Sequence, residues 1–457
     1  MRVSVVESQL VTKTVETRIP FKFGAHVLTR VPLIECRLTV ENEQGRAALG
    51  RSSDLLVPKW FEKNPETSPE EDSGALAHSS VLAVNGLGGI ETAFGHWKNR
   101  YQERVGDRTH EDSDTLVRGF GVALIERALI DGVCRLSGLS FHDALIGGVL
   151  GFSIQNYNIA VLQPPSPTIA VRHTVGMLDP LTIGDVDQRV DDGLPQTLED
   201  DIKAYGLSRF KIKVCGEKEK DQERLRRIAE VVSMNKVADP VYTLDGNEQC
   251  LDLGALAASL EELREDQVAA GLVQRITLIE QPLPRQQTFD PDANAGLERL
   301  SKIAPVIIDE ADTDLEAFRR AAALGYKGVS IKACKGVFRA IQNRAFIDSS
   351  SAGLFQSGED LTNLASIPLQ QDLALQASLG SVDVERNGHH YFRGLEHLPE
   401  GEQESLCNHH HELYKSNEGF RSLNIQGGFL NMETVVNGAG FGGELASIDG
   451  ETLTDAG

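Results

Sequence analysis

Residues 209–216 read RFKIKVCG and place two lysines in what is otherwise an apolar strand. Alternate side chains of a strand point to the same face, so Phe210 and Ile212 face one side while Lys211 and Lys213 face the other. Buried amines are rare unless opposite charges lie beside them. The stretch therefore predicts acidic partners at the ends of neighbouring strands.

The sequence around this stretch, from Thr168 to about Leu395, alternates short apolar strands with helical segments. The expected strands are TIAVRHTVG, RFKIKVCG, VYTLDGNE, ITLIEQP, PVIIDEA, GVSIKACKG, GLFQSGED and SVDVE. Helical stripes such as Leu225, Ile228 and Val232 lie between them. Seven or eight βα units fit a closed parallel barrel, and a doubly wound open sheet is the alternative.

Five successive strands of this series end in a charged residue, and the charges are 23 to 35 residues apart by their numbering, about one βα unit each. They are Lys213, Asp245, Glu280, Asp309 and Lys332. Barrel enzymes carry their chemistry at the C-terminal ends of the strands. The repetition favours the barrel, because an open sheet gives no account of it.

The three acids fall on adjacent strands, where buried carboxylates repel one another unless a cation neutralises them. Oxygen ligands favour a hard divalent ion, Mg²⁺ first and Mn²⁺ second. Lys213 and Lys332 are four strands apart in eight and face each other across the mouth. A carboxylate substrate on the ion would hold its α-carbon between them, and the cation would offset the charge of an enediolate. Lys211, a like charge, is expected with the cation to lower the pKa of Lys213, so that it can act as a base.

The motifs KIK, LDGN, IEQP, IDE and IKACKG, in this order and spacing, resemble those of the enolase superfamily. Within it the chain looks like the muconate-lactonizing-enzyme-like subgroup of the mandelate racemase/muconate lactonizing enzyme family. The segment ERALIDGVCRLSGLSFHDALIG is similar to the N-terminal capping domain of that family. The resemblance spans roughly Pro20 to Leu395. It implies a TIM-like (β/α)₇β barrel, an α+β capping domain, essential Mg²⁺, and abstraction of a proton α to a carboxylate.

The resemblance also implies roles for individual residues. Lys213 and Lys332 would be the acid/base pair and Lys211 an electrostatic helper, with Asp245, Glu280 and Asp309 as metal ligands. The candidates for substrate contact are Phe21, Phe23, Asn247 and His389. Each of these four has a simpler reading: a hydrophobic strand end for the two phenylalanines, a solvent-facing loop for the asparagine, and packing or surface exposure for the histidine.

Two departures from the family pattern make some of the family's activities less expected for this chain. The sixth strand continues as ACKGVF, without the paired glycines of many dipeptide epimerases. The sixth and seventh strands carry no His-Asp pair, which disfavours the mandelate-racemase-like branch. The activities of N-acylamino acid racemases, cycloisomerases and o-succinylbenzoate synthases remain alternatives for this chain.

The remaining sequence sets the expected domains. Residues 1–163 form the capping domain, residues 164–398 the barrel, and residues 399–457 a C-terminal extension that packs on the capping domain or lengthens a loop over the site. Residues 64–80, acidic and rich in proline and serine, are expected to be an exposed loop.

Composition limits the partners. The chain has 457 residues, with 67 acidic against 45 basic residues and a formal charge of -22, which argues against nucleic acid and anionic membranes. No apolar stretch nears the roughly 18 residues that a membrane span needs, and no secretory signal begins the chain. The six cysteines stand singly and predict free thiols in a cytoplasmic protein. Its partners are expected to be a small carboxylate substrate and, in a homo-oligomer, further copies of the chain.

The sequence thus predicts a Mg²⁺-dependent enzyme that forms an enediolate and completes racemisation or epimerisation, cycloisomerisation or syn elimination. It does not choose among these outcomes or name the substrate. Two alternatives belong to other classes of protein. One is an aldolase-type barrel in which Lys213 or Lys332 forms a Schiff base, and the other is a catalytically silent binding protein.

Overall fold

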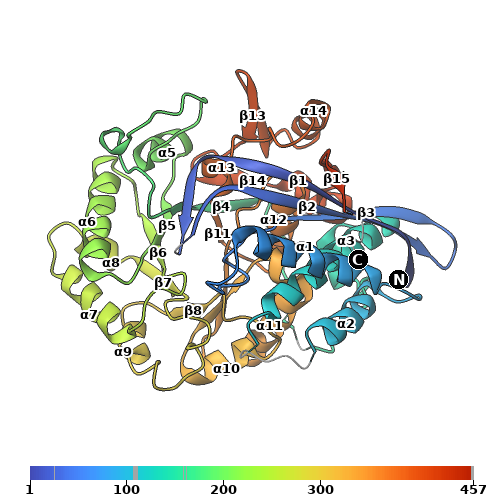
Figure 1. The fold of residues 1–457 in the computed structure, drawn as a ribbon, viewed down its shortest axis with the longest axis horizontal. Coiled ribbons are helices and arrows are strands. Elements are labelled where there is room, and N and C mark those ends of the chain that lie inside the picture. The colour runs from blue at the N-terminus through green and yellow to red at the C-terminus, as the bar shows by residue number, and fades with distance from the viewer. Residues whose placement is uncertain (25, 107–111, 158, 161, 454–457) are drawn as a thin grey trace.

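A closed barrel of parallel strands forms the centre of the computed structural model, which describes residues 1–24, 26–106, 112–157, 159–160 and 162–453 (Figure 1). Its strands follow in chain order: β4 (Thr168–Val175), β5 (Arg209–Lys213), β6 (Val241–Asp245), β7 (Ile276–Glu280), β8 (Val306–Ile308), β9 (Gly328–Ile331), β10 (Phe355–Gly358) and β11 (Asp383–Arg386). The last strand pairs with the first, Val384 against Val171, and closes the barrel. The predicted TIM-like barrel is confirmed, and the open sheet is excluded.

Helices surround the barrel and bury apolar side chains against its strands, and α12 (Ile367–Ser378) is buried on all sides. Leu225 and Ile228 of α6 are 1% and 0% exposed, as the helical spacing predicts. The helices and 3₁₀ turns are η1 (Ile183–Asp185), α5 (Leu198–Tyr205), α6 (Lys218–Met234), α7 (Leu253–Arg264), α8 (Ala270–Val273), α9 (Leu297–Ser301), α10 (Ala317–Leu324), η2 (Ala333–Lys335), α11 (Val337–Ser349), α12 (Ile367–Ser378) and α13 (Gly388–Tyr391).

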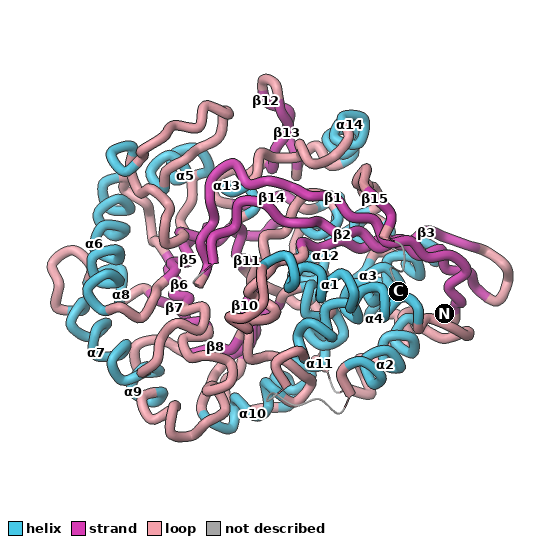
Figure 2. Tube along the Cα trace, viewed as in Figure 1, coloured by secondary structure: helices cyan, strands magenta, loops and turns pink. Residues whose placement is uncertain are grey.

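The N-terminal part forms an antiparallel sheet with helices on it, as expected of an α+β capping domain. The sheet consists of β1 (Val3–Phe23), β2 (His26–Asn42) and β3 (Ala47–Leu55), and the helices are α1 (Pro69–Asn85), α2 (Ala93–Arg104), α3 (Thr115–Ser137) and α4 (Phe141–Ile146). The helix α3 packs so closely on β3 that a Cβ atom added at Gly50 would lie only 2.0 Å from Ala128 O, and only glycine fits there. The long β1 and β2 strands cross the barrel and carry the end of their hairpin toward its mouth (Figure 2).

The loop expected over residues 64–80 is wrong over most of its length, because α1 begins at Pro69. Ser68 Oγ accepts from Glu71 N at 3.2 Å, and Glu71 Oε2 accepts from Ser68 N at 2.7 Å, which is a capping box. Proline suits the first helical position, because the backbone N–H that it lacks would have no partner within the helix. The acidic and proline-rich composition that suggested a loop is that of a helix N-terminus.

The C-terminal segment contacts both sheets. It contains α14 (Glu400–His409), β12 (Tyr414–Asn417), β13 (Phe420–Leu423), β14 (Phe429–Asn431), α15 (Glu433–Asn437), α16 (Ala439–Gly442) and β15 (Glu451–Thr452). Strand β14 pairs antiparallel with β4 of the barrel, and β15 pairs with β1 of the capping sheet, Thr452 against Val11. Within the described residues, no helix combines the length and apolar character needed to cross a bilayer.

Candidate active site

The charged strand ends meet at one level of the barrel mouth. Lys213 on β5 pairs in register with Asp245 on β6, which in turn pairs with Glu280 on β7. Asp309 and Lys332 directly follow β8 and β9. The structure thus brings the five predicted residues together, as parallel strands of similar length require.

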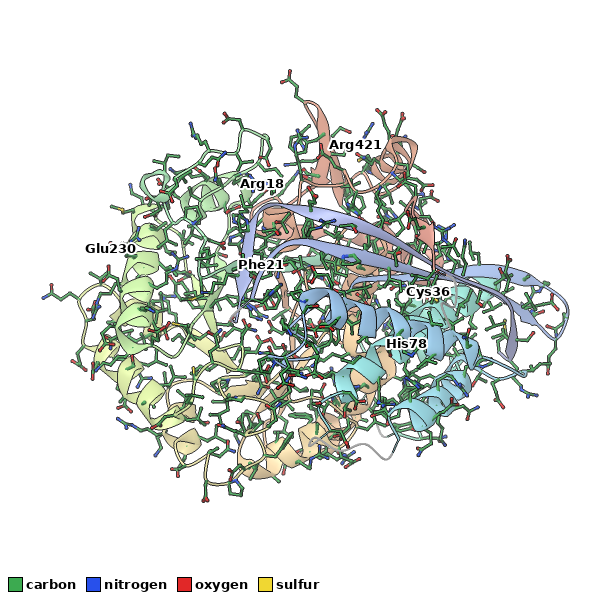
Figure 3. All side chains as sticks on the ribbon, viewed as in Figure 1. Arg18, Phe21, Cys36, His78, Glu230 and Arg421 are labelled. Carbon is green, nitrogen blue, oxygen red and sulfur yellow. The ribbon has the colours of Figure 1, made fainter. Side chains whose placement is uncertain are left out.

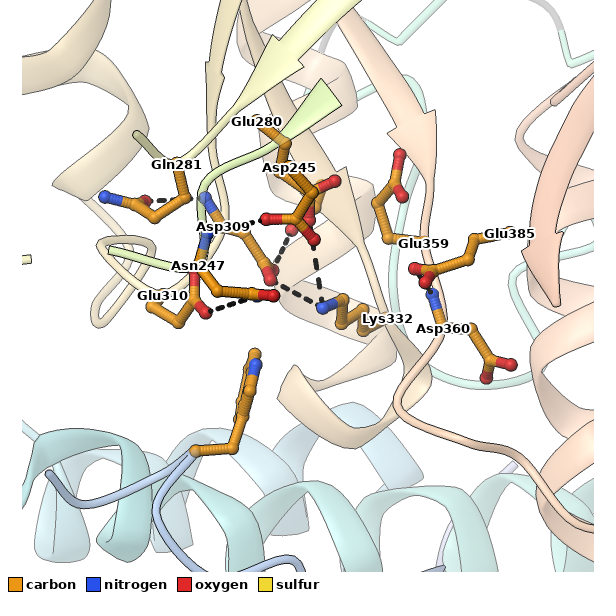
Figure 4. Close-up of polar contacts among 12 residues, drawn as sticks. Asp245, Asn247, Glu280, Gln281, Asp309, Glu310, Lys332, Glu359, Asp360 and Glu385 are labelled. Carbon is orange, nitrogen blue, oxygen red and sulfur yellow. Dashed lines mark hydrogen bonds and ion pairs between the residues drawn. The ribbon is translucent and has the colours of Figure 1, made fainter. Parts of the chain in front are cut away.

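Both mouth lysines pair with carboxylates. Lys213 Nζ lies 2.6 Å from Asp245 Oδ2. Lys332 Nζ lies 2.5 Å from Asp309 Oδ2 (Figure 4). Lys332 Nζ also lies 3.9 Å from Glu280 Oε1. These side chains are almost completely buried, so their charges interact with little screening from water.

The three acids differ in their surroundings. Burial raises the pKa of Glu280 well above its ordinary value, and the nearby Asp245 adds to this shift. Burial also opposes ionisation of Asp309, but Lys332 and Lys335 outweigh it and hold its pKa low. Neither carboxylate oxygen of Glu280 has a hydrogen-bond partner among the described residues, although Oε2 lies 2.6 Å from the ammonium of Lys211.

This donor set fits a hard divalent cation. The candidate ligands Asp245, Glu280 and Asp309 offer only oxygen, are buried, and repel one another, which a bound cation would relieve. Glu280 Oε2 contacts the ammonium of Lys211 at 2.6 Å, and Oε1, which has no hydrogen-bond partner among the described residues, is an acceptor that an ion would satisfy. Mg²⁺ and, second, Mn²⁺ suit such ligands best.

Two amide side chains support these acids. The backbone N–H of Asn247 donates to Asp245 Oδ1 at 2.8 Å, and its side-chain amide donates to Glu310 Oε1 at 3.2 Å. Gln281 Oε1 accepts from the backbone N–H of Asp309 at 2.9 Å. Both amide side chains are buried, so they hold the ends of β6, β7 and β8 in place and are not solvent-facing.

Lys211 lies deeper than the other two lysines and is 0% exposed. Its Nζ is 3.0 Å from Asp245, 2.6 Å from Glu280, 2.8 Å from Glu359 and 2.7 Å from Glu385. Burial disfavours its charge, but these carboxylates raise its pKa well above the ordinary value. Lys211 is therefore an ammonium that binds the acids of four strands together below the mouth.

The sequence analysis missed Glu359 and Glu385, which follow or lie within the seventh and eighth strands. A signal was present, because GLFQSGED and SVDVE both carry acids near their ends. Arg172 of β4 also reaches inward and pairs with Glu359. The charge pattern of the barrel interior thus involves more strands than the five considered from sequence.

A small cavity of ≈ 20 Å³ lies at the mouth. The capping domain contributes Phe21, Phe23 and Trp60, and the barrel contributes Lys213, Asn247, Lys332, Asp360 and Asn387. Lys332 Nζ lies 4.7 Å from the centroid of the Trp60 ring, a cation–π distance. Neither Trp60 nor Asp360 was singled out from sequence. A far larger groove of ≈ 920 Å³, between the β1–β2 sheet and α1, contains none of the charged strand-end residues of the barrel, so volume alone does not locate the site.

Five predicted site residues do not line this cavity. The candidate metal ligands Asp245, Glu280 and Asp309 are buried behind its lysines, and Lys211 lies beneath it. His389 lies on α13, with its Nε2 at 3.1 Å from Nδ1 of His173 on β4. The structure places this histidine in a separate cluster.

Comparison with known proteins finds similarity in structure only. No protein-family model matches the sequence, and no curated protein matches it. A mandelate racemase/muconate lactonizing protein from Herpetosiphon aurantiacus has a TM-score of 0.62 and 16% identity, covering 98% of this chain and 99% of that chain. The muconate lactonizing enzyme of Pseudomonas fluorescens, complexed with muconolactone, has a TM-score of 0.62 and 16% identity over 98% of this chain and 97% of that chain. The L-Ala-D/L-Glu epimerase of Bacillus subtilis, in a substrate-liganded complex, has a TM-score of 0.61 and 15% identity, covering 97% of this chain and 100% of that chain.

These similarities define the class of fold. The chain has the capped barrel fold of the mandelate racemase/muconate lactonizing enzyme structures over nearly its whole length. At the level of the fold, the resemblance inferred from KIK, LDGN, IEQP, IDE and IKACKG is confirmed.

Proposed function

We propose that this chain is an enzyme of the enolase superfamily, in the muconate-lactonizing-enzyme-like subgroup, that requires Mg²⁺ and removes the proton α to the carboxylate of a small substrate. One observation carries the proposal. Lys213 and Lys332 reach from opposite sides of the barrel to one group of carboxylates beside a small cavity. The structural neighbours, which include epimerases and cycloisomerases, support the same reaction class.

In this proposal Asp245, Glu280 and Asp309 hold the ion. When bound, Mg²⁺ supplies positive charge that stabilises a substrate carboxylate as it becomes an enediolate. Lys213 and Lys332 act on the α-carbon from its two faces, one removing a proton and the other able to return one. Such an opposed pair permits racemisation or epimerisation, while a single active lysine suffices for cycloisomerisation or syn elimination.

The capping domain closes the site. Phe21, Phe23 and Trp60 cover the charged mouth with apolar rings, which keeps water from the reacting carbon. The ring of Phe21 stacks on Tyr391 of α13 with centroids 4.0 Å apart, so the hairpin is fixed to the barrel. The cavity of ≈ 20 Å³ has room for about one water molecule, so a substrate with a carboxylate and an apolar portion would enter only if these rings move aside.

Deuterium incorporation in heavy water tests the proposal. A library of N-acylamino acids, dipeptides, lactones and acid sugars is incubated with Mg²⁺ and analysed by mass spectrometry. Metal-dependent exchange that Lys213→Met or Lys332→Met abolishes supports it. Lys203→Met is the matched control, because Lys203 is exposed and pairs with Glu199 on its own helix. Absence of exchange together with absence of Mg²⁺ binding by calorimetry contradicts the proposal.

The two alternative classes give different results. A Schiff-base aldolase would be trapped by borohydride with a mass increase at Lys213 or Lys332 and would keep its activity in a chelator. A silent binding protein would bind ligand without exchange in any condition. Cytoplasmic location and homo-oligomeric assembly stay predictions from the sequence.

A further inference from the structure

A second group of metal-ligating side chains lies outside the barrel wall. It consists of His173 on β4, Asp201 on α5 and His389 on α13, and one donor atom of each lies within 4.8 Å of those of the others. None of these residues lines the cavity at the barrel mouth. The group is therefore distinct from the candidate active site.

Strand alternation explains why His173 points outward. Its neighbours Arg172 and Thr174 reach into the barrel, where Arg172 pairs with Glu359 and Thr174 Oγ1 donates to Glu385 at 2.6 Å. His173 consequently points to the helix layer. The helices α5 and α13 meet it there, at the seam where β11 closes on β4.

The distances within the group are near those of ligands around one ion. One donor atom of each residue lies within 4.8 Å of those of the other two, and His173 Nε2 lies 3.6 Å from Asp201 Oδ2. Tetrahedral ligands at about 2.0–2.1 Å from a zinc ion are about 3.3 Å from one another. His173 can give only one ring nitrogen to an ion, and its Nδ1 lies 3.1 Å from His389 Nε2, so the rings would have to reorient to bring three donors to one centre.

Two donor atoms of the group are left unpaired in the interior. Asp201 is 0% exposed, and its Oδ2 pairs with His390 Nδ1 at 2.9 Å. Asp201 Oδ1 and His389 Nδ1 have no hydrogen-bond partner among the described residues. Unpaired buried polar atoms are costly, so a bound cation here would be stabilising.

We propose that His173, Asp201 and His389 form a second metal site, for a first-row transition ion such as Zn²⁺. Two imidazole nitrogens and one carboxylate suit Zn²⁺ far better than Mg²⁺, which prefers oxygen. His389 also lines a cavity of ≈ 30 Å³ beside the group.

The site would join parts of the chain that contact the capping hairpin formed by β1 and β2. Arg18 of β1 donates to His390 O at 2.8 Å and pairs with Asp192, so the capping hairpin is anchored beside the cluster. Figure 3 shows Arg18 and Phe21 on the same strand, above the barrel. An ion between β4, α5 and α13 would stiffen the surface on which this hairpin rests.

Metal binding by the full chain tests the proposal. The chain is stripped with a chelator, loaded with saturating Mg²⁺, and titrated with Zn²⁺ by calorimetry and with Co²⁺ by visible absorption. We expect one tight Zn²⁺ per chain, Co²⁺ bands of a tetrahedral nitrogen–oxygen site, and a higher unfolding temperature with Zn²⁺. The near-isosteric change Asp201→Asn and the change His389→Gln should each weaken Zn²⁺ binding about 100-fold or more.

Two controls separate this site from other metal-binding positions. His411→Gln removes an exposed histidine and should leave tight Zn²⁺ binding unchanged. Asp309→Asn alters the mouth carboxylates and should also keep it. Equal Zn²⁺ affinity in the parent, Asp201→Asn and His389→Gln would overturn the proposal, as would loss of the tight site in Asp309→Asn. Circular dichroism of each variant shows that the comparison is between folded chains.

Discussion

Lys332 Nζ lies 2.5 Å from Asp309 Oδ2, which pairs the charge that follows β9 with the charge that follows β8. The lysine proposed as a base and the carboxylate proposed as a metal ligand thus form an ion pair. Because the pair is nearly fully buried, removing either partner leaves an uncompensated charge in the interior. The proposal therefore predicts that changes to either residue affect both metal binding and stability.

Glu280→Gln should lose Mg²⁺ binding and keep the fold. A ligand carboxylate is removed, so the Mg²⁺ dissociation constant should rise about 100-fold or more. Because burial and Asp245 already disfavour the charged form of Glu280, the metal-free protein should change in stability by only about 1 kcal/mol. Calorimetry with Mg²⁺ and urea unfolding in a chelator measure the two effects. Unaltered Mg²⁺ affinity would show that Glu280 is not a ligand.

Mg²⁺ should stabilise the parent protein in proportion to its binding. At a concentration 100 times the dissociation constant, a ligand of the native state adds about 2.7 kcal/mol to the free energy of unfolding. Urea unfolding with Mg²⁺ and with chelator measures this difference. Asp309→Asn is the matched control and should show almost none of it. An equal Mg²⁺ effect in both proteins would place the ion elsewhere.

Lys211→Met should destabilise the protein strongly. The change leaves the carboxylates of Asp245, Glu280, Glu359 and Glu385 without their shared ammonium, and breaking a buried charge pair costs about 3–5 kcal/mol. Urea unfolding measures the loss. Lys218→Met removes an exposed lysine paired with Glu262 and should cost at most about 1 kcal/mol. A stable Lys211→Met protein with altered turnover alone would favour the role of electrostatic helper near the substrate.

Phe21→Ala should weaken transition-state binding without unfolding the barrel. Phe21 is 4% exposed and covers the cavity, and burying an aromatic ring contributes about 1.5–3 kcal/mol. If the lid contacts substrate, kcat/KM should fall about 10- to 100-fold. Phe23→Leu, which keeps an apolar side chain, should have a smaller effect. Similar kcat/KM for parent and Phe21→Ala would separate the hairpin from catalysis.

Stability should fall as the pH drops from about 6.5 to about 4, in part because of His410. This ring is 0% exposed, and burial lowers its pKa to about 4, although Glu444 O accepts a hydrogen bond from it. The unfolded chain therefore binds a proton that the native chain does not bind over this window, and the native state loses up to about 3 kcal/mol. His410→Gln should flatten that part of the curve of unfolding free energy against pH. Parallel curves for the two proteins would show that His410 does not contribute.

The strand ends were predictable because the information is local. A period of two fixes which face Lys211 and Lys213 share, and a spacing of one βα unit places Asp245, Glu280 and Asp309 at the same end of successive strands. These two regularities are sufficient for the barrel and for the candidate metal ligands. The helix α1 was missed because a proline-rich, acidic stretch is typical both of a loop and of a helix N-terminus, and only the capping contacts of Ser68 distinguish them.

The sequence by itself determined the barrel, the order of its charged strand ends and the oxygen character of the candidate metal site. The tertiary structure alone decided which charges share partners. Glu359 and Glu385 bind Lys211 across 148 and 174 residues of chain, and His389 lies against His173 across 216 residues. These contacts form when β11 pairs with β4 and the barrel closes. The spacing of residues along one strand or helix cannot predict them, because the partners are far apart in the sequence.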